Sequence, residues 1–240
     1  MRVPPLVSIL LPGLDGTAQL FKPFLAAAPA GLSIRSQALP CERPRGYREL
    51  AEWIVERLPS HPVALIAESF SGPLALLIAD RCPRVAAIVL CASFIESPLA
   101  IPLPKPPAFL WKKPPPLALL RFLLTGGDRE LAESMQRAMA AVPGDVIADR
   151  IANVLRVGVH KELVAFSRPL LCLRATRDRL VARRSEDDRN ARGGVRRDSD
   201  DRLRPAERGI DRRPEPLQEG ARIARLEGDH RRAVGDEDGG

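Results

Sequence analysis

The chain has 240 residues, of which 45% are hydrophobic, so it is long enough to bury one good core. Its net charge of +7 does not arise from a basic tail, because residues 182–240 hold 15 Arg and 15 acidic residues. The basic residues of 1–181 are scattered, with no Lys/Arg stripe interleaved with aromatic residues. This pattern argues against a nucleic-acid-binding function.

The N-terminal apolar run is interrupted by Pro12 and Gly13, so it has neither the layout of a signal peptide nor the length of a membrane span. We therefore expect a soluble, cytoplasmic protein. The four cysteines lie far apart without a Cys-x-x-Cys pair, which predicts reduced structural thiols. No His-x-x-x-His spacing occurs, and the glycines at 13–16 lack the Lys-Ser/Thr of a phosphate loop. We expect neither a metal nor a cofactor.

Apolar runs alternate along the chain with segments of helical period. One face of the helix predicted at 47–58 carries Leu50, Ile54 and Leu58. Strands that are apolar throughout and alternate with helices favour a mainly parallel sheet with helices on both faces. The predicted strands are 6–11, 32–39, 63–67, 85–91 and 169–175, and the predicted helices are 17–28, 47–58 and 71–81.

Residues 94–168 interrupt this alternation and predict a helical lid insertion. Eight prolines between Pro98 and Pro116 exclude a regular helix there, and short helices are expected at about 117–124, 128–141 and 145–157. Some apolar residues of this segment either line a substrate pocket or pack against the core. They are Leu99, Ile101, Leu103, Phe109, Leu110 and Trp111.

The C-terminal part has a different composition. Residues 182–220 are rich in Arg, Asp and Glu, contain no aromatic residue and show no period, which is typical of a solvated or disordered segment. Residues 221–228 again resemble a strand, and Asp229-His230 follow it.

The stretch from Val63 to Leu74 predicts a strand, an abrupt turn and a helix, with Ser69 at the turn. Small residues, Ala67 and Ser71, stand two positions before and after Ser69, as a sharp strand-to-helix turn requires. Such a turn projects the hydroxyl from the strand end, and the first helical amides point to a negative charge forming beside it. This geometry suits acyl transfer. The alternative is an ordinary helix cap, with Ser69 or Ser71 accepting from a first-turn amide.

Three segments together resemble the α/β-hydrolase superfamily over residues 1–181. Residues 10–17 (Leu-Leu-Pro-Gly-Leu-Asp-Gly-Thr) resemble its glycine loop, 67–74 (Ala-Glu-Ser-Phe-Ser-Gly-Pro-Leu) its nucleophile elbow, and 173–181 the strand end that bears its acid. The resemblance implies an α/β-hydrolase fold. It also implies Ser69 as nucleophile, Asp178 as acid, and the Leu14 and Phe70 amides as the oxyanion hole.

The base implied by the order Ser, Asp, His is His230, because His61 precedes the elbow strand and His160 lies in the insertion. One helix, one strand and two loops should separate acid and base by about 25 residues, yet Asp178 and His230 are 52 apart. We therefore hypothesise that 182–220 is a disordered insertion or a frame-shifted stretch. Residues 1–240 would then form one α/β-hydrolase domain, with 221–230 as its last strand and His loop.

Other polar residues near these motifs have weaker claims. Glu96 is an alternative acid position, and Ser93 is expected to cap a strand end. Asp15 should stabilise its own turn, and Glu68 need not react. The sequence thus predicts a carboxylesterase-like serine hydrolase acting on a small-molecule acyl ester. The alternatives are an inactive protein of the same fold without a docked His and, more weakly, a nucleic-acid-associated protein using its Arg-rich tail.

Overall fold

The computed structural model describes residues 6–98, 107–111, 113–174 and 223–225. Its strands are β1 (Val7–Leu11), β2 (Ile34–Ser36), β3 (Val63–Glu68), β4 (Val85–Cys91), β5 (Leu170–Arg174) and β6 (Ile223–Arg225). Its helices are η1 (Gln19–Phe21), α1 (Lys22–Ala26), α2 (Tyr47–Val55), α3 (Ser71–Arg81), η2 (Ala108–Trp111), α4 (Leu117–Leu123), α5 (Arg129–Ala140), α6 (Gly144–Val154) and α7 (His160–Ala165), where η marks a 3-10 helix.

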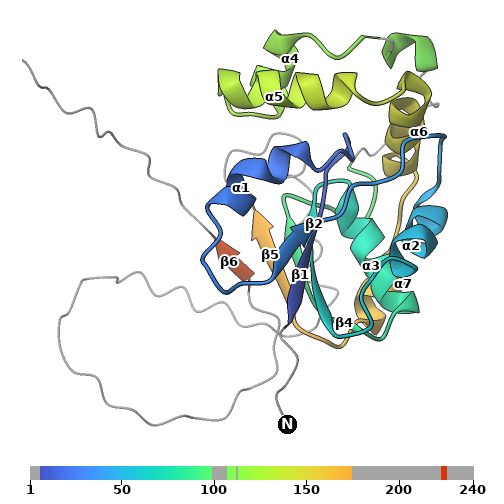
Figure 1. The fold of residues 1–240 in the computed structure, drawn as a ribbon. Coiled ribbons are helices and arrows are strands. Elements are labelled where there is room, and N and C mark those ends of the chain that lie inside the picture. The colour runs from blue at the N-terminus through green and yellow to red at the C-terminus, as the bar shows by residue number, and fades with distance from the viewer. Residues whose placement is uncertain (1–5, 99–106, 112, 175–222, 226–240) are drawn as a thin grey trace, which may run out of the picture.

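The strands form one parallel sheet in the order β2-β1-β3-β4-β5-β6. Helix α1 lies on one face, and α2, α3 and α7 lie on the other (Figure 1). The predicted parallel sheet with helices on both faces is therefore confirmed. Because β3 pairs with β1 on one side and β4 on the other, its carboxyl end is flanked by the ends of both neighbours.

The main core lies between the sheet and the helices of its α2–α3 face. The inner face of α2 is buried, with Leu50 1% and Ile54 0% exposed. The helix ends at Val55, before the predicted end at 58, and Leu58 lies beyond it with 9% of its surface exposed. Helix α3 is apolar on nearly all sides because it packs against the sheet, α2 and α7. Burying each large aliphatic side chain contributes about 1.5–3 kcal/mol, so this layer fixes the position of β3 and of the turn that follows it.

Between β4 and β5, helices α4, α5 and α6 lie beyond the carboxyl ends of the strands (Figure 1). Their buried side chains form a second apolar cluster, made of Leu120, Ala132, Met139, Val142, Val146 and Ile147. The three short helices predicted here are confirmed. The sequence did not predict η2 or α7, which have only four and six residues.

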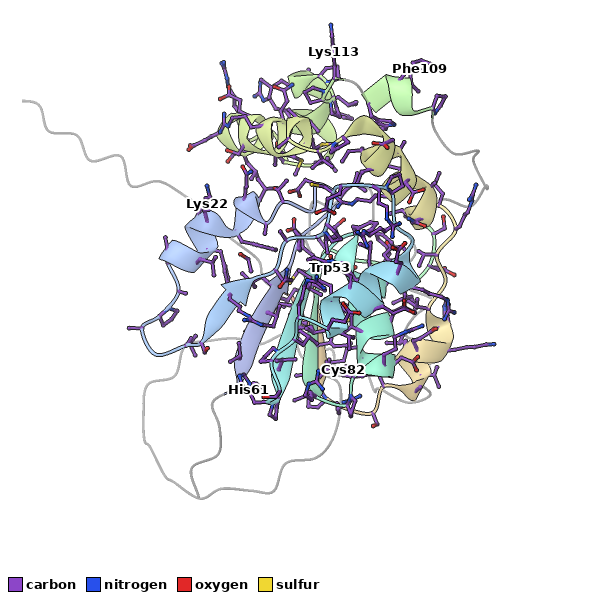
Figure 2. The ribbon with its side chains drawn as sticks, turned by 45° about the vertical axis from the view of Figure 1, so that its right-hand side comes forward. Lys22, Trp53, His61, Cys82, Phe109 and Lys113 are labelled. Carbon is purple, nitrogen blue, oxygen red and sulfur yellow. The ribbon has the colours of Figure 1, made fainter. Side chains whose placement is uncertain are left out.

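Phe109 and Leu110 do not line a buried pocket, because they are 64% and 58% exposed. Figure 2 shows Phe109 on the outer side of the insertion, away from the sheet. Trp111 is half-buried and packs against the insertion's apolar cluster. Phe109 and Leu110 are not packed against the core either, so neither of their two predicted roles is confirmed. Leu99, Ile101 and Leu103 lie outside the described residues.

Strand β6 falls within the strand predicted at 221–228 and pairs with β5. Residues 182–220, Asp178 and His230 lie outside the described residues. Within the described ranges, no helix has the length and apolar character needed to cross a membrane.

Candidate active site

Ser69 lies at the abrupt turn between the end of β3 and the start of α3, with a backbone φ of 45°. A non-glycine residue in this left-handed region costs about 1–3 kcal/mol, so the surroundings must hold it there. The Ser69 amide donates to the Cys91 carbonyl at 2.9 Å. Its carbonyl accepts from the Gly72 amide at 3.1 Å and from the Ser93 hydroxyl at 2.6 Å. These three bonds fix the strained serine.

The turn is not an ordinary serine cap. The cap position of α3 is Phe70, and no side chain there bonds a first-turn amide. The Ser71 hydroxyl, fully buried, instead donates to the carbonyl of Pro12. Ser93, which the sequence predicts to be a strand-end cap, supports the carbonyl of Ser69 directly. The helix-cap interpretation of Ser69 and Ser71 is therefore wrong.

The residues two before and three after Ser69 must be small because neighbouring groups pack closely against them. Ala67 is 0% exposed. A Cβ on Gly72 would lie 1.8 Å from the Ser93 hydroxyl oxygen and 2.8 Å from the Ser93 Cβ. Any side chain at position 72 would therefore push away the loop that holds the Ser69 carbonyl.

Phe70 is held from the other side by Tyr47 of α2. The two rings stack with centroids 4.7 Å apart, and the Tyr47 hydroxyl donates to the Phe70 carbonyl at 2.9 Å. Burial raises the pKa of Tyr47 well above its usual range, so the hydroxyl stays a donor at neutral pH. Among the described residues, no acceptor is paired with the Phe70 amide.

The loop after β1 is a compact turn next to Ser69. The Gly16 amide donates to the Gly13 carbonyl at 3.1 Å, and the Asp15 carboxylate accepts from the Thr17 amide and hydroxyl at 2.9 and 2.6 Å. The local turn role predicted for Asp15 is confirmed. In the described part of the chain the Leu14 amide also has no paired acceptor. Sequence reasoning missed Arg150, whose guanidinium donates to the carbonyls of Leu14 and Asp15.

Glu68 is a half-buried carboxyl group directly before Ser69. Burial and, to a smaller extent, the negative charge of Asp15 raise the pKa of Glu68, and a hydrogen bond from the Gly13 backbone lowers it; the net result is a pKa of about 7. A Cβ on Gly13 would lie 3.7 Å from both Cδ and Oε1 of Glu68. Glu68 is therefore part of the wall of this site and changes its charge near neutral pH.

The two histidines of the described ranges lie in different surroundings. His61 precedes β3, at the edge of the sheet opposite the insertion (Figure 2). At about 3.3 Å per residue, the length of β3 separates it from Ser69 by roughly 20 Å or more. His160 Nε2 lies 4.0 Å from the carboxylate of Glu96, and no described hydrogen bond joins either residue to Ser69. The assignments of Asp178 and His230 stay predictions.

In the described ranges, no three or more His, Cys, Asp or Glu side chains are grouped so that they could hold a metal ion. Four groups lie around the carboxyl ends of β1 and β3: the Ser69 side chain, the Leu14 and Phe70 amides and the Glu68 carboxyl. This arrangement places one hydroxyl group beside two backbone N–H groups that have no described acceptor.

No protein-family model matches the sequence, and no curated protein matches it. Solved structures do match. An enol-lactonase from Burkholderia xenovorans LB400 aligns with a TM-score of 0.59 at 15% identity, covering 73% of this chain and 75% of that one. An esterase from Rhodococcus sp. ECU1013 aligns at 0.55 and 16%, covering 75% and 76%.

A thioesterase from the prodiginine biosynthetic pathway of Streptomyces coelicolor aligns with a TM-score of 0.51 at 18% identity, covering 74% of this chain and 69% of that one. Together with the parallel sheet order and the turn at Ser69, these likenesses show that the chain has the α/β-hydrolase fold. The superfamily resemblance of the sequence is thereby confirmed at the level of fold.

Proposed function

We propose that the protein is a serine hydrolase that cleaves carboxylic esters through an acyl-enzyme on Ser69. The observation that carries this proposal is the strained backbone of Ser69, at φ 45° and fixed by three hydrogen bonds between β3 and α3. Strain of this kind is retained where the surrounding structure over-determines it, and such places cluster at active sites. The lactonase, esterase and thioesterase names of the structural neighbours support the same class of reaction.

In the proposed reaction the Ser69 oxygen attacks the ester carbonyl while His230 takes the hydroxyl proton. Asp178 holds that imidazole in the right tautomer and stabilises its protonated form. The Leu14 and Phe70 amides bind the oxyanion of the tetrahedral intermediate, and one such donor is worth about 3–4 kcal/mol of barrier. The protonated imidazole then gives its proton to the leaving alcohol, and water releases the acyl group in a second, equivalent step.

A second candidate is a protein of the same fold without hydrolase activity. The observation that favours it is that His61 lies at the opposite sheet edge and that no described hydrogen bond joins His160, which lies beside Glu96, to Ser69. In that case the site at Ser69 would bind a small molecule without turning it over. The two candidates differ in whether a base activates the serine.

The test is labelling of the purified protein by a fluorophosphonate probe, which reports an activated serine without knowledge of the substrate. We expect the wild type to label, and Ser69→Ala, Asp178→Ala and His230→Ala to lose most or all labelling. Ser60→Ala, at an exposed serine that precedes β3, is the matched control and should still label. A folded wild type that does not label would favour the inactive candidate. Unchanged labelling of His230→Ala would reject His230 as the base.

A further inference from the structure

Arg150 of α6 is a charged residue that is almost completely buried, with 2% of its surface exposed. Its guanidinium contacts backbone carbonyls of two other loops. Nη1 donates to the Leu14 and Asp15 carbonyls at 3.0 and 2.7 Å, and Nη2 donates to the Pro40 carbonyl at 3.0 Å. Burial lowers the pKa of Arg150, and the charge of Asp15 acts in the opposite direction. Arginine nevertheless stays protonated in proteins, so a cation sits inside this ring of carbonyls.

The loop is shaped to receive this side chain. A Cβ on Gly16 would lie 2.4 Å from Nη1 of Arg150 and 2.7 Å from both Cζ and Nη2. Gly16 also has a φ of +69°, a conformation that L side chains rarely adopt. Its carbonyl accepts from the Leu39 amide at 2.8 Å. The glycine therefore allows the guanidinium to lie directly against the backbone.

The contacts bear on the orientation of the Leu14 amide. This N–H shares a peptide unit with the Gly13 carbonyl, which accepts from the Gly16 amide. Arg150 holds the next two carbonyls, those of Leu14 and Asp15. Three consecutive peptide units are thus fixed, and two of them are fixed by a side chain that comes from the insertion.

We propose that Arg150 is a positioning residue: it orients the Leu14 amide for the oxyanion and ties helix α6 of the insertion to the loop after β1. This inference rests on the proposed function. Lysine at the same position has its donors at a single point and cannot span the Leu14–Asp15 and Pro40 carbonyls together. Arg150 thus couples the insertion to the site, since α6 cannot move away from the loop without breaking three charged hydrogen bonds.

The test compares Arg150→Met and Arg150→Lys with the wild type and with Arg137→Met, an exposed arginine of the same insertion. Hydrogen exchange followed by mass spectrometry reports the order of the loop, because the Gly16, Thr17 and Leu39 amides are all hydrogen-bonded in the wild type. We expect faster exchange of residues 13–17 and 38–40 in Arg150→Met, with exchange of β3 and α3 unchanged. Arg137→Met should match the wild type.

On an ester substrate, we expect kcat of Arg150→Met to fall by about 10- to 100-fold, less than the loss of an oxyanion donor itself, with KM nearly unchanged. Arg150→Lys should recover part of kcat. Unchanged exchange at 13–17, or a uniform rise of exchange over the whole chain, would overturn the proposal, and so would a change confined to KM. An unlabelled and inactive wild type would reject the proposed function instead, and the exchange data alone would then decide whether Arg150 orders the loop.

If Arg150→Met does not fold, Gly16→Ala breaks the same contact from the other side, because its Cβ overlaps the guanidinium. The same local change in exchange is expected from this variant. Exchange of 13–17 at the wild-type rate in folded Gly16→Ala would overturn the proposal.

Discussion

The turn at Ser69 and the insertion above it are held in place in different ways. The turn is fixed by short-range backbone geometry: a strained φ, the small residues Ala67 and Gly72, and hydrogen bonds from neighbouring strand ends. The insertion has its own apolar cluster and contacts the loop after β1 through the buried side chain of Arg150. Changes at the turn should therefore have larger and more local effects than comparable changes in the insertion.

The largest expected effect is that of Gly72→Ala. Its Cβ would overlap the Ser93 side chain and lie 3.3 Å from the Phe94 carbonyl, so the loop that supports Ser69 must move. Overpacking of this kind costs about 3 kcal/mol of the free energy of unfolding. Urea denaturation measures it. Gly158→Ala is the matched control, because nothing lies within 4 Å of its Cβ. Equal, small effects of the two substitutions would contradict the close approach at Gly72.

The second effect is the pH dependence of the free energy of unfolding that Glu68 causes. Its pKa rises from 4.5 to about 7 on folding, so between these pH values the folded protein binds more protons than the unfolded chain. The stabilisation of the folded protein by this protonation is therefore present in full below about pH 4.5 and is lost as the pH rises through 7. At roughly 1.4 kcal/mol per pKa unit, it amounts to at most about 3.5 kcal/mol, of which about 2.5 kcal/mol is lost between pH 5 and pH 8.

We expect Glu68→Gln to gain stability relative to the wild type between pH 5 and pH 8, measured as urea midpoints at both values. Glu52→Gln, at an exposed glutamate of α2, controls for the loss of one carboxylate. A difference between Glu68→Gln and the wild type that does not change with pH would show that Glu68 titrates normally in the folded protein.

A smaller effect compares one kind of hydrogen bond in the two regions. Tyr47→Phe removes the hydroxyl that donates to the buried Phe70 carbonyl, and Thr125→Val removes a hydroxyl that donates to the exposed Asp128 carbonyl in the insertion. A buried carbonyl left unpaired loses its partner without gaining a hydrogen bond to water. We therefore expect the free energy of unfolding to fall by about 1–2 kcal/mol in Tyr47→Phe and by under about 0.5 kcal/mol in Thr125→Val. Thermal unfolding ranks the two. The reverse order would show that water reaches the Phe70 carbonyl.

The turn was predictable from the sequence because its determinants lie within a few residues of Ser69. A buried strand, a small residue on either side and an apolar helix leave the chain few other conformations. Asp15 was predictable for the same reason, since it bonds Thr17 two residues away. The parallel sheet followed from strands that are apolar on both faces.

The remaining features depend on residues distant in sequence. Nothing in the helical period of 145–157 marks Arg150 as buried, because its carbonyl partners lie 110 to 136 residues away. The Ser71 hydroxyl bonds Pro12 across 59 residues. Phe109 and Leu110 were expected to be covered because they are apolar, but apolar residues are common on protein surfaces. Helix α7 is too short for a periodic pattern, with only Leu163 buried.

The proposed reaction requires that Ser69 become acylated, and the position of the acyl group on the chain tests this requirement. We would mix the protein with p-nitrophenyl acetate, quench the reaction in acid and map the peptides by mass spectrometry. We expect one acetyl group on the peptide that contains Ser69, and none on this peptide in Ser69→Ala or in protein unfolded before mixing. Folded wild-type protein with no acetyl group on Ser69, or with acetylation only at Lys and Cys side chains, would contradict it.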